Sequence, residues 1–161
     1  MFRKIKAITV LLALLFLTTP KAHSQEVFEA VLKSATDIVD NPNSDDAQIQ
    51  IAQFKITTLT YIHRKMVELN PDASAHDLDV QAYYMSVYLT HFLSDVYKLR
   101  GASNNTRAKQ LKVYIETSKN NPLFNDPDKS IVHAYIGDGE SLTPFSIDTN
   151  WQKACEILKF E

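Results

Sequence analysis

LDVQAYYMSVYLTHFLSDVYKL (residues 78–99) is the stretch that decides the fold of this chain. Its apolar residues recur at alternating steps of four and three, so they share one side of an α-helix. Such a seam is typical of a helix that packs nearly parallel or antiparallel to its neighbours. Because four tyrosines widen the apolar surface, we expect this to be the central helix. The seam is Leu78, Ala82, Met85, Leu89, Phe92, Val96 and Leu99, and the tyrosines are Tyr83, Tyr84, Tyr88 and Tyr97.

Three other segments show the same helical period. The first covers residues 27–39, the second begins near Asp45 and runs to about Leu69, and the third covers residues 106–119. Asp45 and Gln48 have the spacing of a capping box at the start of the second segment. In the segment 106–119 we expect an inward side made of Ala108, Leu111, Ile115 and Ser118, with Tyr114 beside them.

These segments predict an all-α fold, a four-helix up-down bundle with an irregular C-terminal segment and a short fifth helix. The first helix is acidic and the fourth is basic. In a closed up-down bundle these two helices are neighbours, so we expect their charges to meet, although exposed pairs contribute only on the order of a few tenths of a kcal/mol each. The charged residues concerned are Glu26, Glu29, Asp37 and Asp40, and Arg107, Lys109, Lys112 and Lys119.

The C-terminal segment allows two interpretations. Residues 131–136 form either a short helix that ends at Gly137 or the first strand of a hairpin whose second strand is residues 142–147. Pro144 weakens that second strand, so the helix is favoured. A last helix is expected over residues 150–159, with Asp148 or Thr149 as its cap and an apolar side of Trp151, Ala154, Cys155 and Leu158. Cys155 is the only cysteine, and a buried free thiol is favoured over a disulfide between two chains.

The first 24 residues have the layout of a cleavable secretory signal peptide. A basic start is followed by an apolar run over residues 7–17 and by the candidate cleavage site Ala22-His23-Ser24. Gln25 comes next, where a bacterial lipoprotein would have cysteine. We therefore expect an exported protein, periplasmic or secreted and not a lipoprotein, with one domain of residues 25–161.

The expected mature chain is acidic. Removing residues 1–24 also removes Arg3, Lys4, Lys6 and Lys21, which leaves 13 basic against 19 acidic residues and a formal net charge of −6. This charge disfavours nucleic acid and anionic membrane surfaces as partners, because both repel an acidic domain. No second apolar run is long enough for stable membrane insertion. A protein partner, and a basic one, is the better expectation.

Three residues that could bind a metal or transfer protons are candidates for one site. His63 falls in the apolar side of the second helix, and His91 and Asp95 lie one turn apart on the central helix. Facing helices could bring the three together as a metal or acid–base site. Their spacing matches no established metal-ligand signature. The favoured interpretation is that the histidines are hydrogen-bonded to tyrosine or aspartate. We therefore expect no metal and no cofactor.

Core packing of the central helix is the favoured interpretation of the tyrosines. They also allow a binding surface, because tyrosine is favoured where an apolar ring is buried and its hydroxyl stays wet. We expect any ligand or partner surface to lie beside Tyr84, Tyr88 and His91, with Asp95 and His63 as further members. The predicted function is therefore a non-catalytic binding or protein-interaction module of the bacterial cell envelope. The alternative is a bundle that binds a small ligand or metal, with hydrolytic activity at His63, His91 and Asp95.

Overall fold

The computed structural model describes residues 25–69, 75–127 and 145–160. Within these ranges the chain is all-α, as predicted. The signal peptide and the choice between helix and hairpin for residues 131–144 lie outside them and stay predictions. The helices are α2 (Glu26–Asp40), α3 (Asp46–Leu69), α4 (Ala75–Lys98), α5 (Asn104–Asn120) and α7 (Trp151–Leu158).

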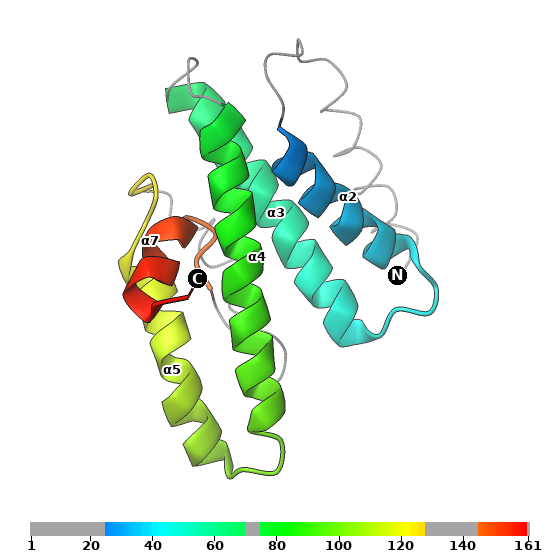
Figure 1. Ribbon diagram of the computed structural model, residues 1–161, viewed down its shortest axis with the longest axis vertical. Coiled ribbons are helices and arrows are strands. Elements are labelled where there is room, and N and C mark those ends of the chain that lie inside the picture. Colours follow the sequence, from blue (N-terminus) through cyan, green and yellow to red (C-terminus); the bar gives the residue numbers. More distant parts are fainter. Residues whose placement is uncertain (1–24, 70–74, 128–144, 161) are drawn as a thin grey trace.

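α4 is the central element of the described structure, as its seam predicts. It contacts α2 and α3 as well as α5 and α7. The helices from α2 to α5 run in alternating directions, and α7 lies beside α4 and the C-terminal end of α5 (Figure 1). None of the described helices combines the length and apolar character needed to cross a membrane.

The prediction that the first and fourth helices are in contact is wrong. α2 packs against α3 and α4, α5 packs against α4 and α7, and α2 and α5 do not touch. The two helices lie on opposite sides of α4 (Figure 1). The reason is the position of α7. Its buried aromatic and small residues pack on a flank of α4 that the other helices would cover in a closed four-helix bundle. The acidic and basic helices are therefore the two outer helices of the described structure.

Local signals set most helix ends. The capping box of α3 is present, because the Gln48 amide donates to Asp45 Oδ1 at 2.8 Å and the Asp45 amide donates to Gln48 Oε1 at 3.0 Å. Gly101 follows α4 with φ of +86°, a conformation that glycine adopts without strain. The cap of α7 is Asn150, whose side chain accepts from the Lys153 amide, and not Asp148 or Thr149. Asp148 instead accepts hydrogen bonds from backbone amides of the loop after α5.

The inward side of α5 agrees with the prediction except at Ala108. Ser118 and Tyr114 are buried, and Leu111 and Ile115 pack against the core, whereas Ala108 is exposed. Tyr114 and Ser118 also make hydrogen bonds to residues of α4 and of the segment before α7. These bonds fix α5 against its two neighbours.

The core consists of two clusters of unequal size. The main cluster lies between α4, α5, α7, α3 and the start of α2, which contributes Phe28, and its centre is aromatic. Trp151, Tyr88 and Phe145 are fully buried there, with ring centroids 5.3 to 6.5 Å apart. The smaller cluster joins α2 to the first half of α3 through Ala35, Ala52 and Ile56.

Candidate functional site

The outward side of α4 is uncharged over four turns. Residues 80–94 contain no Asp, Glu, Lys or Arg. A shallow hollow of about 280 Å³ lies on this side, and Tyr83, half exposed at 49%, stands on it. We call its lining the α4 outward face: Tyr83, Ser86, Val87, Thr90 and His91. An uncharged helix surface with an exposed aromatic ring suits contact with another protein.

Tyr88 is not part of that surface but of the core, which is the interpretation favoured for the tyrosines of this helix. It is fully buried, and its hydroxyl donates to the backbone carbonyl of Tyr114. Burial raises its pKa well above the ordinary range, with the Cys155 and Tyr114 side chains adding to the effect. Tyr84 is half-buried at the side of α4, where its carbonyl accepts a hydrogen bond from the Cys155 thiol at 3.4 Å. Of the predicted trio only His91 lines the hollow.

His91 and Asp95 lie one turn apart in the C-terminal half of α4, as their spacing predicts. The His91 ring stacks on Phe160, with centroids 4.1 Å apart and planes 4° from parallel. The Asp95 carboxylate accepts from the Tyr114 hydroxyl at 2.6 Å and from Lys98 Nζ at 2.9 Å. The Tyr114 and Lys98 hydrogen bonds lower the pKa of Asp95. This carboxylate therefore stays ionised and holds α5 against α4.

His63 lies elsewhere, in the contact between α3 and α2. Its ring stacks on Phe28 with centroids 5.7 Å apart, and it is half-buried. Burial lowers its pKa, because desolvation disfavours the imidazolium. Among the described residues no three His, Cys, Asp or Glu side chains are placed to hold a metal ion. The structure thus brings His91 to Asp95 and leaves His63 in a different helix contact.

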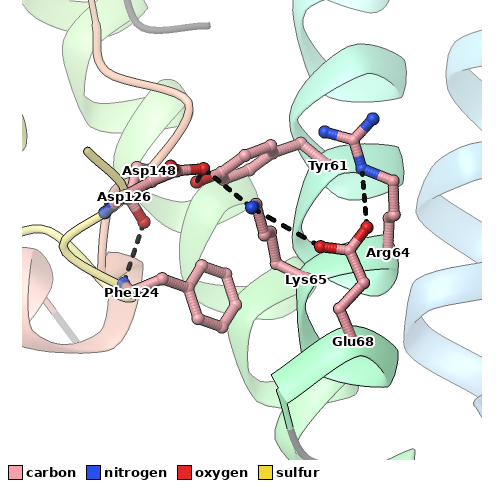
Figure 2. Close-up of polar contacts among 7 residues, drawn as sticks. All are labelled: Tyr61, Arg64, Lys65, Glu68, Phe124, Asp126 and Asp148. Carbon is pink, nitrogen blue, oxygen red and sulfur yellow. Dashed lines mark hydrogen bonds and ion pairs between the residues drawn. The ribbon is translucent and has the colours of Figure 1, made fainter. Parts of the chain in front are cut away.

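A polar cluster that the sequence did not predict connects α3 to the loop after α5 (Figure 2). The Asp126 carboxylate, 4% exposed, accepts from the Tyr61 hydroxyl at 3.0 Å and pairs with Lys65 Nζ at 3.1 Å. Lys65 also lies 3.5 Å from Glu68 Oε2. Burial raises the pKa of Tyr61, and the charges of Asp148 and Asp126 raise it further. The phenol therefore stays protonated and acts as a hydrogen-bond donor to Asp126.

Asp148 completes this cluster, which we call the Asp126–Asp148 clasp. It is 3% exposed, and its carboxylate accepts from the backbone amides of Phe124 at 2.9 Å and Asp126 at 3.0 Å. Its carbonyl also accepts from the Leu123 amide at 2.9 Å. The loop thus folds around Asp148, with Asn125 at φ of +52°. Because these carboxylates are used as acceptors for the chain itself, the clasp positions the loop and is not an open acid–base pair.

A second buried polar network holds the start of α7. Ser118 Oγ and Thr149 Oγ1 are 2.7 Å apart, and the Ser146 amide donates to Ser118 Oγ at 2.9 Å. The Trp151 amide donates to Gln81 Oε1 at 2.8 Å. Sequence reasoning missed both networks. Their members are polar residues far apart along the chain, and the only local signal was the polar triplet before Trp151, which we interpreted as a cap.

Cys155 is free and buried, as favoured from the sequence. Burial raises the pKa of its thiol to about 12. Because the thiolate is the nucleophilic form, this cysteine is inert near neutral pH.

Comparison with protein families, curated proteins and solved structures finds no match to this chain. Its function is therefore inferred from its own surfaces.

Proposed function

We propose that this chain is an exported, non-catalytic protein-interaction module of the bacterial cell envelope, with the α4 outward face as its contact surface. The observation that carries the proposal is the uncharged outward side of the central helix, with a half-exposed tyrosine above a shallow hollow. Interfaces are depleted in charged residues at their centre and enriched in tyrosine. A rigid central helix presents such a surface at little cost in conformational entropy.

The titratable groups support a non-catalytic role. Asp95 and Tyr114 bond to each other, Tyr61 donates to Asp126, and Cys155 donates to a backbone carbonyl. Each has a shifted pKa, and the cause in each case is burial or a contact that holds two elements together. Shifted pKa values often indicate catalytic sites, but structural networks produce them as well.

The partner that fits this surface is a protein with an apolar centre and a basic rim. The Phe28 amide donates to Asp79 Oδ1 at 2.9 Å, which places the start of α2 one turn of α4 before Tyr83. Glu26 and Glu29 belong to that start and are exposed. Carboxylates beside an uncharged centre would steer a basic partner and set its orientation.

The proposed location follows from the N-terminal residues. Residues 1–24 combine a basic start, an apolar run and a small-residue cleavage site before Gln25. We propose that they are removed on export and that the protein works in the periplasm or outside the cell without a lipid anchor. N-terminal sequencing of the protein recovered from its host would give Gln25 as the first residue, and retention of Met1 would contradict export by cleavage.

The interaction is tested by site-specific photo-crosslinking in the native host. A photoreactive residue at Thr90, which is exposed on the α4 outward face, is expected to capture one dominant envelope protein. Tyr83→Arg should abolish that product, because it places a cation at the uncharged centre. Val67→Arg is the matched control, since Val67 is 55% exposed on α3, and it should leave the product unchanged.

Two results would overturn the proposal. One is a crosslinked product that persists in the Tyr83→Arg variant, because the captured protein would then be a bystander. The other is the absence of any product above background at Thr90 while the protein is present at its normal level. Circular dichroism of both arginine variants checks that the helices are intact.

A further inference from the structure

The outward side of α2 carries a regular stripe of charges. Glu26, Glu29, Lys33, Asp37 and Asp40 follow one another at steps of three or four, so they share one side of the helix. All of them are exposed, and the buried residues Phe28 and Ala35 lie on the opposite side. We call this set the acidic stripe; Lys33 is its single cation.

The outward side of α5 carries a stripe of the opposite sign. Lys109, Lys112, Glu116 and Lys119 also follow at steps of three or four, and all are exposed. We call this set the lysine stripe; Glu116 is its single anion. In each stripe the odd charge is held by a neighbour four residues away, Lys33 by Asp37 and Glu116 by Lys112.

The two stripes match in sign, and three successive residues of each match in spacing. When Lys33 is set opposite Glu116, two neighbouring acids of α2 fall opposite lysines of α5. For parallel helices, residues 26 and 29 face residues 109 and 112, and residue 37 lies one position from residue 119. For antiparallel helices, residues 40 and 37 face residues 109 and 112, and residue 29 lies one position from residue 119. A register with three complementary pairs, and a fourth displaced by one residue, therefore exists in either direction.

The two stripes cannot meet within one molecule. α2 and α5 make no contact, and they lie on opposite sides of α4 (Figure 1). We propose that the acidic stripe docks on the lysine stripe of a second copy of this chain, with Lys33 opposite Glu116. Such a contact joins two different surfaces, so each added copy leaves one stripe of each kind free, and the assembly grows until it closes into a ring or ends as a short chain.

This self-association has a defined salt dependence. Exposed ion pairs are each weak, so the assembly depends on several pairs acting together and is screened as the Debye length shortens. The contact uses α2 and α5 and none of the five residues of the α4 outward face, although Glu26 and Glu29 of the acidic stripe also lie beside that face. The inference therefore does not rest on the proposed function, and Tyr83→Arg should leave it unchanged.

The test is sedimentation velocity of the protein purified after export. In about 20 mM NaCl the average mass should rise with protein concentration, and in about 500 mM NaCl it should return to that of one chain. Each single charge reversal, Lys33→Glu or Glu116→Lys, should weaken association roughly fivefold, because an attractive pair becomes a repulsive one. The double variant that carries both reversals should restore it.

These variants separate a specific register from attraction by net charge alone. Lys33→Glu makes the acidic stripe more negative and Glu116→Lys makes the lysine stripe more positive, so attraction by net charge would strengthen with either substitution. Stronger association in the single variants would overturn the proposed register. A chain that stays monomeric at low salt up to about 500 μM would overturn the docking itself, because that concentration is far above the dissociation constant of a useful weak contact.

Discussion

The two sides of α4 are held in different ways. On the side of α5 and α7, hereafter the α7 side, large aromatic residues meet around Trp151, and buried hydroxyl and carboxylate groups connect segments far apart in the sequence. The hairpin of α2 and α3, by contrast, is joined in its outer half by the small cluster of Ala35, Ala52 and Ile56. The α7 side is specified by aromatic packing and hydrogen bonds together, and the outer half of the hairpin by a short apolar seam.

This difference shows how a small chain without a disulfide can combine a fixed core with a looser edge. Buried polar groups are costly unless every partner is in place, so the networks of the α7 side favour a single arrangement. The seam in the outer half of the hairpin has no such requirement and contains only three buried residues among those described. We therefore expect the free energy of unfolding to be concentrated on the α7 side and α2 to open more readily than α7.

The largest expected effect comes from Trp151→Ala. Trp151 is fully buried and contacts the rings of Phe54, Tyr88 and Phe145. Truncating a buried tryptophan costs about 3–5 kcal/mol of the free energy of unfolding, which urea denaturation followed by circular dichroism would measure. Ile157→Ala on the same helix is the control, because Ile157 is 51% exposed, and it should cost less than about 1 kcal/mol. Equal losses in the two variants would show that α7 is not part of the core.

The next effect is expected from Asp148→Asn in the Asp126–Asp148 clasp. An amide has one acceptor oxygen, so one of the Phe124 and Asp126 amides would lose its partner and face an N–H group instead. Leaving a buried donor unpaired costs about 1–3 kcal/mol, again measured by urea denaturation. Asp37→Asn is the exposed control and should have almost no effect. A stable Asp148→Asn protein would mean that the loop 121–127 does not depend on the clasp.

A smaller effect is expected at the start of α3. Asp45→Ala removes the acceptor for the Gln48 amide and should cost about 1 kcal/mol. Because this cap belongs to the hairpin, hydrogen exchange should rise in α2 and the first half of α3 while α7 is unaffected. Asp40→Ala, at the C-terminal end of α2, should leave the hairpin as stable or slightly more stable, since it removes a negative charge from the negative end of the helix. A uniform rise in exchange over the whole chain would argue against an independent hairpin.

The smallest expected effect is a dependence of the stability of the α2–α3 hairpin on pH. Burial lowers the pKa of His63 in the folded chain below its ordinary value of about 6.5. The stability that the neutral ring contributes is therefore complete above pH of about 6.5 and is lost as the pH falls through the folded-state pKa. Thermal unfolding at pH values on either side should show this loss, and His63→Phe should reduce it. If both proteins respond equally to acid, the groups responsible lie elsewhere.

Much of the fold could be predicted because its signals are local. The seam from Leu78 to Leu99 indicates α4, the spacing of Asp45 and Gln48 indicates the start of α3, and Gly101 marks the end of α4. The buried positions of Trp151, Ala154 and Cys155 follow from the period of α7. Each of these signals lies within about one or two turns of the residues it describes.

Apart from the cap of α7, the errors involve contacts between distant segments. Tyr88 is buried because Trp151 and Phe145 cover it, and neither residue lies near it in the sequence. On α5 the period of the sequence places Tyr114 and Ser118 inward correctly, and Ala108 is the exception. Because distant residues cover Tyr88, the expected surface beside Tyr84, Tyr88 and His91 is reduced to His91 and its neighbours on the outward side of α4. The Asp126–Asp148 clasp had no local signal at all.

The contrast between the two sides of α4 is tested most directly by native-state hydrogen exchange of the exported protein, resolved to single amides. We expect the amides of Ala154 and Cys155 in α7, and those in the centre of α4, to exchange only through global unfolding. The amides of residues 32–38 in α2 should exchange through a smaller, local opening. If α2 is protected as strongly as α7, or if α7 exchanges before α2, the stability of this molecule is not concentrated on the α7 side.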